Sequence, residues 1–163
     1  MHKSTHGRIA QLAISPGGVP KLPVTEAVVD EMGLADDRHR GSGHGGPERA
    51  VCLFALEVIE RLQAEGHPIA PGTAGENVTI AGLDWRLVTP GVRLRLGNDV
   101  LLEVTRYTTP CLNIAFSFTN GQFARILYED HPGESRVYTR VVQQGTLRTG
   151  DPVELLVEPA AVW

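Results

Sequence analysis

The stretch GVRLRLGNDVLLEVT, residues 91–105, predicts a β-hairpin. Leucines alternate with arginines up to Leu96, a GND turn signal follows, and apolar residues return at alternate positions from Val100. A period of two places one face of a strand in a core and the other toward solvent, while Gly, Asn and Asp adopt the backbone conformations of tight turns. We therefore expect two antiparallel strands here, with the rest of the chain supplying the sheet that covers their apolar face.

The strand pattern recurs along the chain. Strand-like runs bounded by Gly- and Pro-rich turns occupy residues 7–15 and 22–33, a further strand opens the segment 50–66, and two last strands are expected within 135–157. Together these runs predict a mainly β protein.

Two helices are expected at the periphery. The segment 50–66 continues from its strand into apolar residues at helical spacing and ends at Gly66, a plausible C-cap, while residues 120–133 predict a short helix with Asn120 as N-cap. Strands and helices do not alternate as in βαβ folds. We therefore expect one domain over residues 1–163, built as a mainly antiparallel barrel or sandwich.

The composition restricts the protein class. Hydrophobic residues make up 42% of the chain and charged residues 21%, as in globular proteins, and no apolar run approaches the roughly 20 residues of a membrane span. The N-terminus has no signal-peptide core, so the expected location is the cytoplasm. A net charge of −4 and a pI near 5.8 argue against a broad electropositive surface for nucleic acid.

The chain has two cysteines, and a reducing compartment predicts that both are free thiols. Cys52 lies in the apolar run VCLF and is expected in the core. Cys111 follows Pro110 in TTPC, where a strand should stop, because proline cannot continue the hydrogen-bond ladder. It is therefore either a pocket residue or one more buried cysteine, and the local sequence leaves both interpretations open.

Two polar stretches are candidates for ligand binding. In GLADDRHRGSGHGGPERAV, residues 33–51, the glycines let backbone approach a ligand, and Arg38 and Arg49 could hold an anionic group; the alternative is a surface loop with solvated charges. In PGTAGENVTIAG, Glu76 and Asn77 either form a turn or hydrogen-bond a polar ligand.

Five motifs in register resemble the MOSC family, the domain found at the C-terminus of molybdenum-cofactor sulfurases and in small standalone proteins. They are GLADDRH, HGGPERAV, GTAGEN, LEVTRYTTPC and PGESRVYTRVVQQGTLRTGDPV, and the match runs from about Gly7 to Leu156. The resemblance implies a β-barrel of mostly antiparallel strands with a few peripheral helices. It also implies that Cys111 is the functional cysteine, which carries persulfide sulfur or ligates molybdenum.

A site for the molybdenum cofactor, molybdopterin, follows from the same resemblance. A soft thiolate suits a molybdenum already held by pterin sulfurs, and the same thiolate can accept sulfur. Nearby arginines could stabilise that thiolate and bind the pterin phosphate. The predicted cofactor-binding residues are Arg38, His44, Arg49, Glu76, Asn77, Arg106 and Arg140, with Cys111 as the metal ligand.

Features of the larger relatives are missing from this sequence. Neither Lys3 nor Lys21 has a phosphate-binding context, and 163 residues leave no room for a desulfurase domain, so no covalently bound pyridoxal phosphate is expected. The preceding barrel of the reductase relatives and any iron–sulfur or flavin motif are also missing. We therefore expect partners: a sulfur donor such as a cysteine desulfurase, or a molybdoenzyme recipient.

Two other functions fit the same residues. One is a molybdenum-dependent reductase of N-hydroxylated compounds that works with external electron-transfer proteins. The other is a hydrolase or transferase in which Cys111 pairs with His39, His44 or His131. A histidine within hydrogen-bond reach of Cys111 would distinguish the second.

Overall fold

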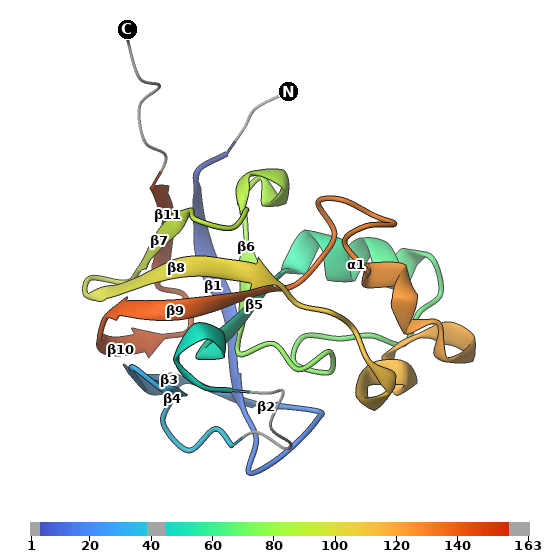
Figure 1. Ribbon diagram of the computed structural model, residues 1–163, viewed down its shortest axis with the longest axis horizontal. Helices are drawn as coiled ribbons and strands as arrows, with labels where there is room; N and C mark the ends of the chain where they lie inside the picture. The colour runs from blue at the N-terminus through green and yellow to red at the C-terminus, as the bar shows by residue number, and fades with distance from the viewer. Residues whose placement is uncertain (1–3, 39–44, 157–163) are drawn as a thin grey trace, which may run out of the picture.

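The computed structural model describes residues 4–38 and 45–156. Within this range seven strands close into a β-barrel in the order β11-β7-β8-β9-β5-β6-β1, since β1 pairs with both β6 and β11 (Figure 1). They are β1 (His6–Ile14), β5 (Val51–Ala55), β6 (Val78–Ala81), β7 (Arg93–Leu96), β8 (Val100–Tyr107), β9 (Val137–Gln143) and β11 (Pro152–Leu156). The predicted mainly β fold and the barrel are confirmed.

Strands β7 and β8 form the predicted hairpin. Leu96 pairs with Val100 and Leu94 with Leu102 in antiparallel register, and all four side chains are fully buried. The intervening side chains of β7 are exposed or half-buried. The alternation of leucine and arginine in the sequence therefore predicts which face of this hairpin packs into the barrel core.

One connection departs from the expected antiparallel pattern. β5 and β6 are parallel, with Leu53 opposite Val78, and α1 (Leu56–Ala64) joins them as a βαβ unit that the sequence did not predict. This βαβ unit occurs once, and turns connect α1 to β6. The sequence therefore shows no repeated alternation of strands and helices. The helix itself is confirmed: its apolar face is buried, and the chain leaves it through Gly66 at φ +100°.

Both ends of the chain contain more strands than expected. Residues 22–33 and 135–157 were predicted as one and two strands, and both predictions are wrong. The first segment holds β2 (Leu22–Val24), β3 (Glu26–Asp30) and the start of β4 (Gly33–Leu34), and the second holds β10 (Gly145–Arg148) between β9 and β11. β2 pairs with β1, whereas β10, β3 and β4 form a second, small sheet. The chain changes sheets at Gly145, where a Cβ would lie 2.8 Å from the Cβ of Asp99.

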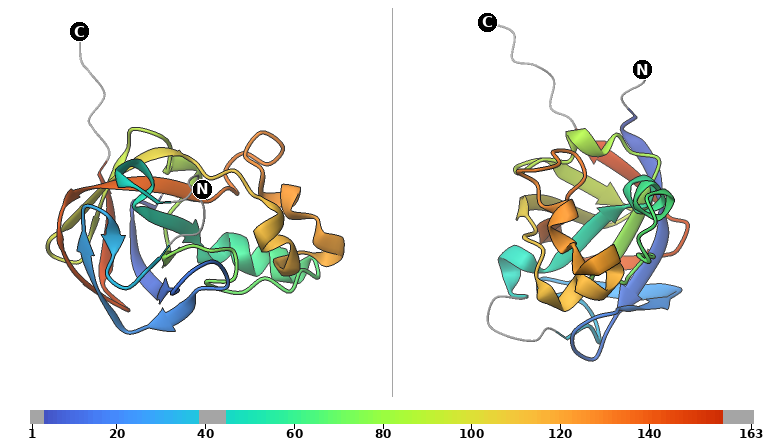
Figure 2. Two further views of the ribbon diagram at one scale, coloured as in Figure 1. Left: turned by 60° about the horizontal axis from the view of Figure 1, so that its bottom comes forward. Right: turned by 90° about the vertical axis from the view of Figure 1, so that its right-hand side faces the viewer.

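Between β8 and β9 the chain leaves the barrel and returns, and we call residues 108–136 the excursion. It holds the 3-10 helices η3 (Leu112–Ser117), η4 (Thr119–Gly121) and η5 (Phe123–Ile126). The short helix predicted over 120–133 is present only as the 3-10 turns η4 and η5, and the predicted N-cap is wrong, because Asn120 adopts a left-handed conformation at φ +56° inside η4. Figures 1 and 2 show the excursion beside α1, on one side of the barrel.

Two further 3-10 turns, η1 (Pro47–Arg49) and η2 (Trp85–Leu87), complete the described elements. None of the helices in residues 4–38 and 45–156 has the length and apolar character needed to cross a bilayer.

Candidate functional site

A cavity of about 220 Å³ lies beside the end of β8, and Cys111 is part of its wall. The lining residues are Gly18, Val19, Lys21, Arg38, Arg49, Cys52, Ala74, Gly75, Asn77, Thr108, Thr109, Cys111, Asn113, Ile114, Arg136 and Tyr138. The fold therefore brings residues of all five sequence motifs to one cavity. Arg38 and Arg49 border the same cavity as Cys111, and their predicted contact with a cofactor stays a prediction.

Cys111 occupies the first stem of the excursion. Beyond β8 one more backbone bond joins the two stems, from Thr108 N to Arg136 O at 2.9 Å, and Pro110 then has no N–H with which to continue the ladder. Cys111 is a free, half-buried thiol. The predicted strand end with a thiol that opens onto a cavity is confirmed, and the alternative of a core cysteine is wrong.

Among the described residues, four cationic side chains line the cavity: Lys21, Arg38, Arg49 and Arg136. Arg136 is the most deeply placed of the arginines and is only 6% exposed. Its Nη1 donates to Ala74 O at 2.7 Å, but within the described part of the chain nothing accepts the hydrogen of its Nε. Because Arg136 lines the cavity and forms no ion pair among the described residues, its positive charge suits an anionic ligand there.

Asp37 and Asn77 organise the cavity wall. Asp37 Oδ1 accepts from Lys21 Nζ at 2.7 Å and from Ser15 N at 2.9 Å, and its Oδ2 accepts from Asn77 Nδ2 at 2.9 Å. Asn77 also donates to a backbone carbonyl of β1 at 3.3 Å and accepts from Cys52 N at 3.0 Å. The side-chain amide of Asn77 thus hydrogen-bonds to β1, to β5 and to the 36–38 segment, and these bonds hold the three together. Its predicted contact with a cofactor stays a prediction.

Glu76 lies behind this wall and does not line the cavity. Its carboxyl is fully buried; Oε2 accepts from Thr79 Oγ1 at 3.1 Å, and Oε1 has no partner among the described residues. Burial raises the pKa of Glu76, and hydrogen bonds and the nearby Arg136 only partly oppose that effect. The arrangement suits a carboxyl that keeps its proton.

Arg106 and Arg140, also predicted to bind the cofactor, are not brought to the cavity. Arg106 is exposed. Arg140 lies farther along β9 and donates through Nε to Glu103 Oε2 at 2.8 Å, which lowers the pKa of Glu103. His44 lies outside the described residues, and its predicted role stays a prediction.

Among residues 4–38 and 45–156 no histidine lines the cavity. His131 lies on the excursion, with Nδ1 3.7 Å from Glu134 Oε1. A hydrolase pairing of Cys111 with His131 is therefore not formed, while His39 and His44 fall outside the described residues.

Sequence reasoning missed Lys21, Arg136 and Tyr138 as cavity residues. Tyr138 is the register partner of Cys52, so both side chains leave the same face of the sheet, and the Arg49 guanidinium lies 5.8 Å from the Tyr138 ring centroid. The available signal for Arg136 was its place at the start of β9, next to the strand that ends before Cys111.

Cys52 is buried, as predicted, and also touches the cavity. It is 5% exposed, its Sγ lies 3.8 Å from Thr108 Oγ1, and burial raises the pKa of its thiol. Cys52 is therefore a buried part of the cavity wall, whereas Cys111 is the more accessible of the two thiols.

Comparisons with known proteins agree on one family. The model of the MOSC domain matches residues 40–154, which is more than half of the chain. A protein named "Reductase" from Gibberella moniliformis is 32% identical over 136 residues, and YflK of Bacillus subtilis is 30% identical over 146 residues. These matches cover 80% and 85% of this chain, but the chain spans only 24% of the fungal protein and 63% of YflK.

Solved structures show the same fold. YiiM from Geobacillus stearothermophilus superposes with a TM-score of 0.74 at 24% identity, covering 93% of this chain and 75% of that one. YiiM from Escherichia coli gives 0.68 at 25% identity, covering 95% and 72%. With the family model, the motif order and the barrel in agreement, the chain belongs to the MOSC domain family.

Proposed function

We propose that the cavity binds the molybdenum cofactor and that Cys111 is its working thiol, either as a carrier of persulfide sulfur or as a ligand of molybdenum. The observation that carries the proposal is the pairing of an accessible thiol with three arginines, Arg38, Arg49 and Arg136, around one cavity; Lys21 also lines it but is ion-paired with Asp37. Few other ligand classes need both a soft sulfur donor and a strongly cationic wall.

The residues present fit this cofactor. The pterin phosphate would find cationic partners in the side chains of Arg38, Arg49 and Arg136, which all line the cavity. The Cys111 thiolate would be the soft ligand. When bound, the cofactor supplies a redox-active metal whose sulfur ligands can be exchanged.

Sulfur carriage needs only Cys111 and a persulfide donor. The Cys111 thiolate attacks the outer sulfur of the donor persulfide, a new S–S bond forms on Cys111, and the donor departs as a thiolate. The proposed partners are therefore a sulfur donor such as a cysteine desulfurase and a molybdoenzyme recipient. A reducing compartment such as the cytoplasm would keep Cys111 available for this exchange.

The test is the content of protein purified from a host that makes the cofactor. We expect molybdenum and pterin, or the mass of one added sulfur on Cys111, in the natural protein. Cys111→Ser should lose both, while the matched variant Cys52→Ala should keep them. Protein that contains neither metal nor pterin nor added sulfur, or a Cys111→Ser variant loaded like the natural protein, would contradict the proposal.

A second candidate is a molybdenum-dependent reductase of N-hydroxylated compounds. It is favoured by one observation, the 32% identity to the fungal protein named "Reductase". The chain covers 24% of that protein, so electrons would come from separate donor proteins or domains. Reduction of an N-hydroxylated substrate by the cofactor-loaded protein with an added electron donor would select this candidate over sulfur carriage.

A further inference from the structure

The excursion that carries Cys111 is joined to the barrel at a single point of the sheet. Tyr107 pairs with Val137, and Thr108 N donates to Arg136 O, so residues 109–135 leave and return at neighbouring positions. Cys111 lies on the first stem and Arg136 on the last residue of the second. The direction in which the excursion is held therefore affects both residues at once.

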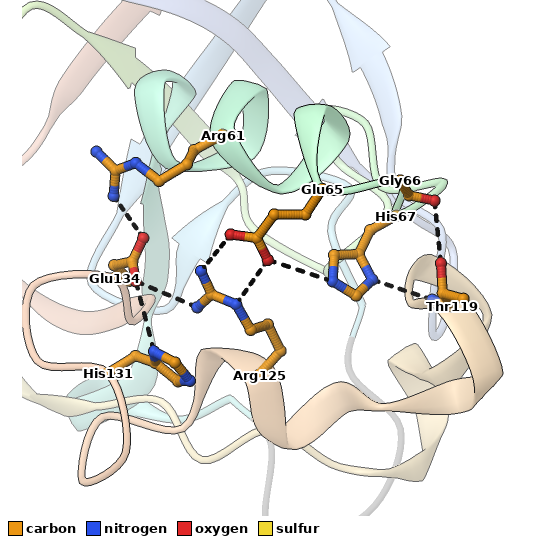
Figure 3. Close-up of polar contacts among 8 residues, drawn as sticks. All are labelled: Arg61, Glu65, Gly66, His67, Thr119, Arg125, His131 and Glu134. Carbon is orange, nitrogen blue, oxygen red and sulfur yellow. Dashed lines mark hydrogen bonds and ion pairs between the residues drawn. The ribbon is translucent and has the colours of Figure 1, made fainter.

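Ion pairs centred on Arg125 fix the excursion to α1 (Figure 3). Arg125 of η5 forms a two-pronged contact with Glu65 at the end of α1, through Nε at 2.9 Å and Nη2 at 2.8 Å. Its Nη1 donates to Glu134 Oε1 at 3.2 Å, and Arg61 of α1 binds the other oxygen of Glu134. One guanidinium thus links the end of α1, through η5, to Glu134 near the second stem of the excursion. We call these four residues the clamp.

A second set of contacts holds the same segment a few residues away. Thr119 N donates to His67 Nδ1 at 3.0 Å, and Thr119 Oγ1 donates to Gly66 O at 3.0 Å. The His67 ring meets Phe118 edge-on at 5.4 Å, and Ser117 Oγ donates to Thr73 Oγ1 at 3.0 Å. These contacts fix η3 and η4 beside the 66–73 loop.

The excursion is packed by apolar residues and is also held by directional polar contacts. Ile114, Phe118 and Ile126 are buried, and apolar contacts are not directional. The hydrogen bonds of Arg125 are directional, because its planar guanidinium binds two carboxylates at once and its side chain is only 15% exposed. An error in this docking would be passed along η3 to Asn113, Ile114 and Cys111, which form one wall of the cavity.

We propose that Arg125 is a positioning residue for Cys111: by clamping the excursion to α1, it sets how far the thiol and the Arg136 guanidinium face the cavity. The inference rests on the proposed function only in treating Cys111 as the working thiol. Arg125 itself does not line the cavity and takes no part in the chemistry.

The test compares Arg125→Leu and Arg125→Lys with a matched surface control, Arg148→Leu, in the purified full chain. Arg148 pairs with Glu26 at 3.4 Å on the small sheet, away from the excursion. The measurements are the rate of Cys111 alkylation by iodoacetamide in native protein, amide hydrogen exchange of residues 112–134, and the urea midpoint. Arg125→Lys keeps the charge but loses the fork.

We expect Arg125→Leu to raise both the Cys111 alkylation rate and exchange in 112–134 by about fivefold or more, from the loss of an ion-pair network that holds a locally opening segment. Exchange in β1, β6 and β8 should stay unchanged, Arg125→Lys should recover part of the effect, and Arg148→Leu should show none. If Arg125→Leu fails to fold, Arg125→Lys and Glu65→Gln carry the same test at smaller amplitude.

Unchanged Cys111 alkylation in these variants would overturn the proposal, as would exchange that rises equally throughout the barrel. The readouts need neither metal nor sulfur. If the alkylation rate does not respond to the Arg125 variants but the protein carries cofactor, only the positioning role fails. If the rate responds but the protein carries no cofactor, only the proposed function fails.

Discussion

The cavity and the clamp both depend on arginines, but these have opposite partners. In the clamp, Arg61 and Arg125 are matched by Glu65 and Glu134, so the charges cancel within the protein. In the cavity, Arg136 bonds a backbone carbonyl and, within the part of the chain that the structure describes, forms no ion pair. Arginines that pair with carboxylates hold elements together, whereas an arginine with an unused donor favours a ligand.

The carboxylates record the same difference. The hydrogen bond from Arg125 lowers the pKa of Glu65. Burial acts to raise the pKa of Glu134, but hydrogen bonds from Arg61 and Arg125 outweigh it and lower the pKa. Behind the cavity, burial raises the pKa of Glu76. The clamp therefore favours charged carboxylates, whereas burial favours the protonated form of Glu76 behind the cavity. Because Asp37 pairs with Lys21 in the cavity wall, the remaining positive charge of the cavity comes from its arginines.

Replacement of Arg136 should have the largest effect on ligand binding. Arg136→Leu should weaken binding of inorganic phosphate, used as a probe for the pterin phosphate, by about tenfold or more, since hydrogen bonds to charged groups contribute about 1.5–3 kcal/mol. Arg140→Leu is the control, because its side chain is bound to Glu103. Isothermal titration measures the phosphate affinity of both variants. An equal loss of affinity in the two would show that Arg136 does not bind phosphate in the cavity.

The two cysteines should separate stability from function. Cys52→Ser should lower the free energy of unfolding by about 1–3 kcal/mol, since a hydroxyl is placed in a buried wall, while Cys111→Ser should change it by about 0.5 kcal/mol or less. Urea denaturation measures both. A Cys111→Ser variant that is the less stable of the two would indicate that Cys111 is mainly a packing residue.

The pH dependence should differ between the two regions. Glu65 and Glu134 have folded-state pKa values below the ordinary 4.5, so they contribute stability above that pH, which is lost as pH falls through the folded pKa. Glu76 has a raised folded-state pKa, so its contribution is present below 4.5 and is lost as pH rises through the folded pKa.

Chemical denaturation of two variants across pH checks these signs. Glu134→Gln should flatten the curve of unfolding free energy against pH below about pH 4.5, because it removes a carboxylate whose folded-state pKa is lowered. Glu76→Gln should flatten the curve between about pH 5 and 8, because it removes an acid that releases its proton in the unfolded chain more readily than in the folded protein. An unchanged curve for Glu76→Gln between these pH values would mean that the Glu76 carboxyl is charged in the folded protein.

Local patterns in the sequence were enough for the hairpin, for α1 and for the strand end before Cys111. The alternation of residues 91–105 and the missing N–H of Pro110 act over a few residues, so they can be read directly. The left-handed Asn120 could not be predicted, because the excursion is shaped by contacts with α1 that are distant in sequence.

The candidate site was predictable only in part for the same reason. Arg38 and Arg49 were found because glycine-rich loops often line pockets. Arg136 and Arg140 look alike in the sequence, but strand register places one beside the stem of Cys111 and the other opposite Glu103. Strand register is set by pairing across the barrel, which no single segment encodes.

The central claim is that Cys111 is the accessible thiol of an anion-binding cavity, and protection from alkylation tests it most directly. Native protein is labelled with limiting iodoacetamide, with and without excess inorganic phosphate, and both cysteine peptides are quantified by mass spectrometry. Cys111 should be labelled first, and phosphate should slow it in the natural protein but not in Arg136→Leu. Cys52, which is buried and has a raised pKa, should stay unlabelled until the protein is denatured. Labelling of Cys52 before Cys111, or a Cys111 rate that phosphate does not change, would contradict the account.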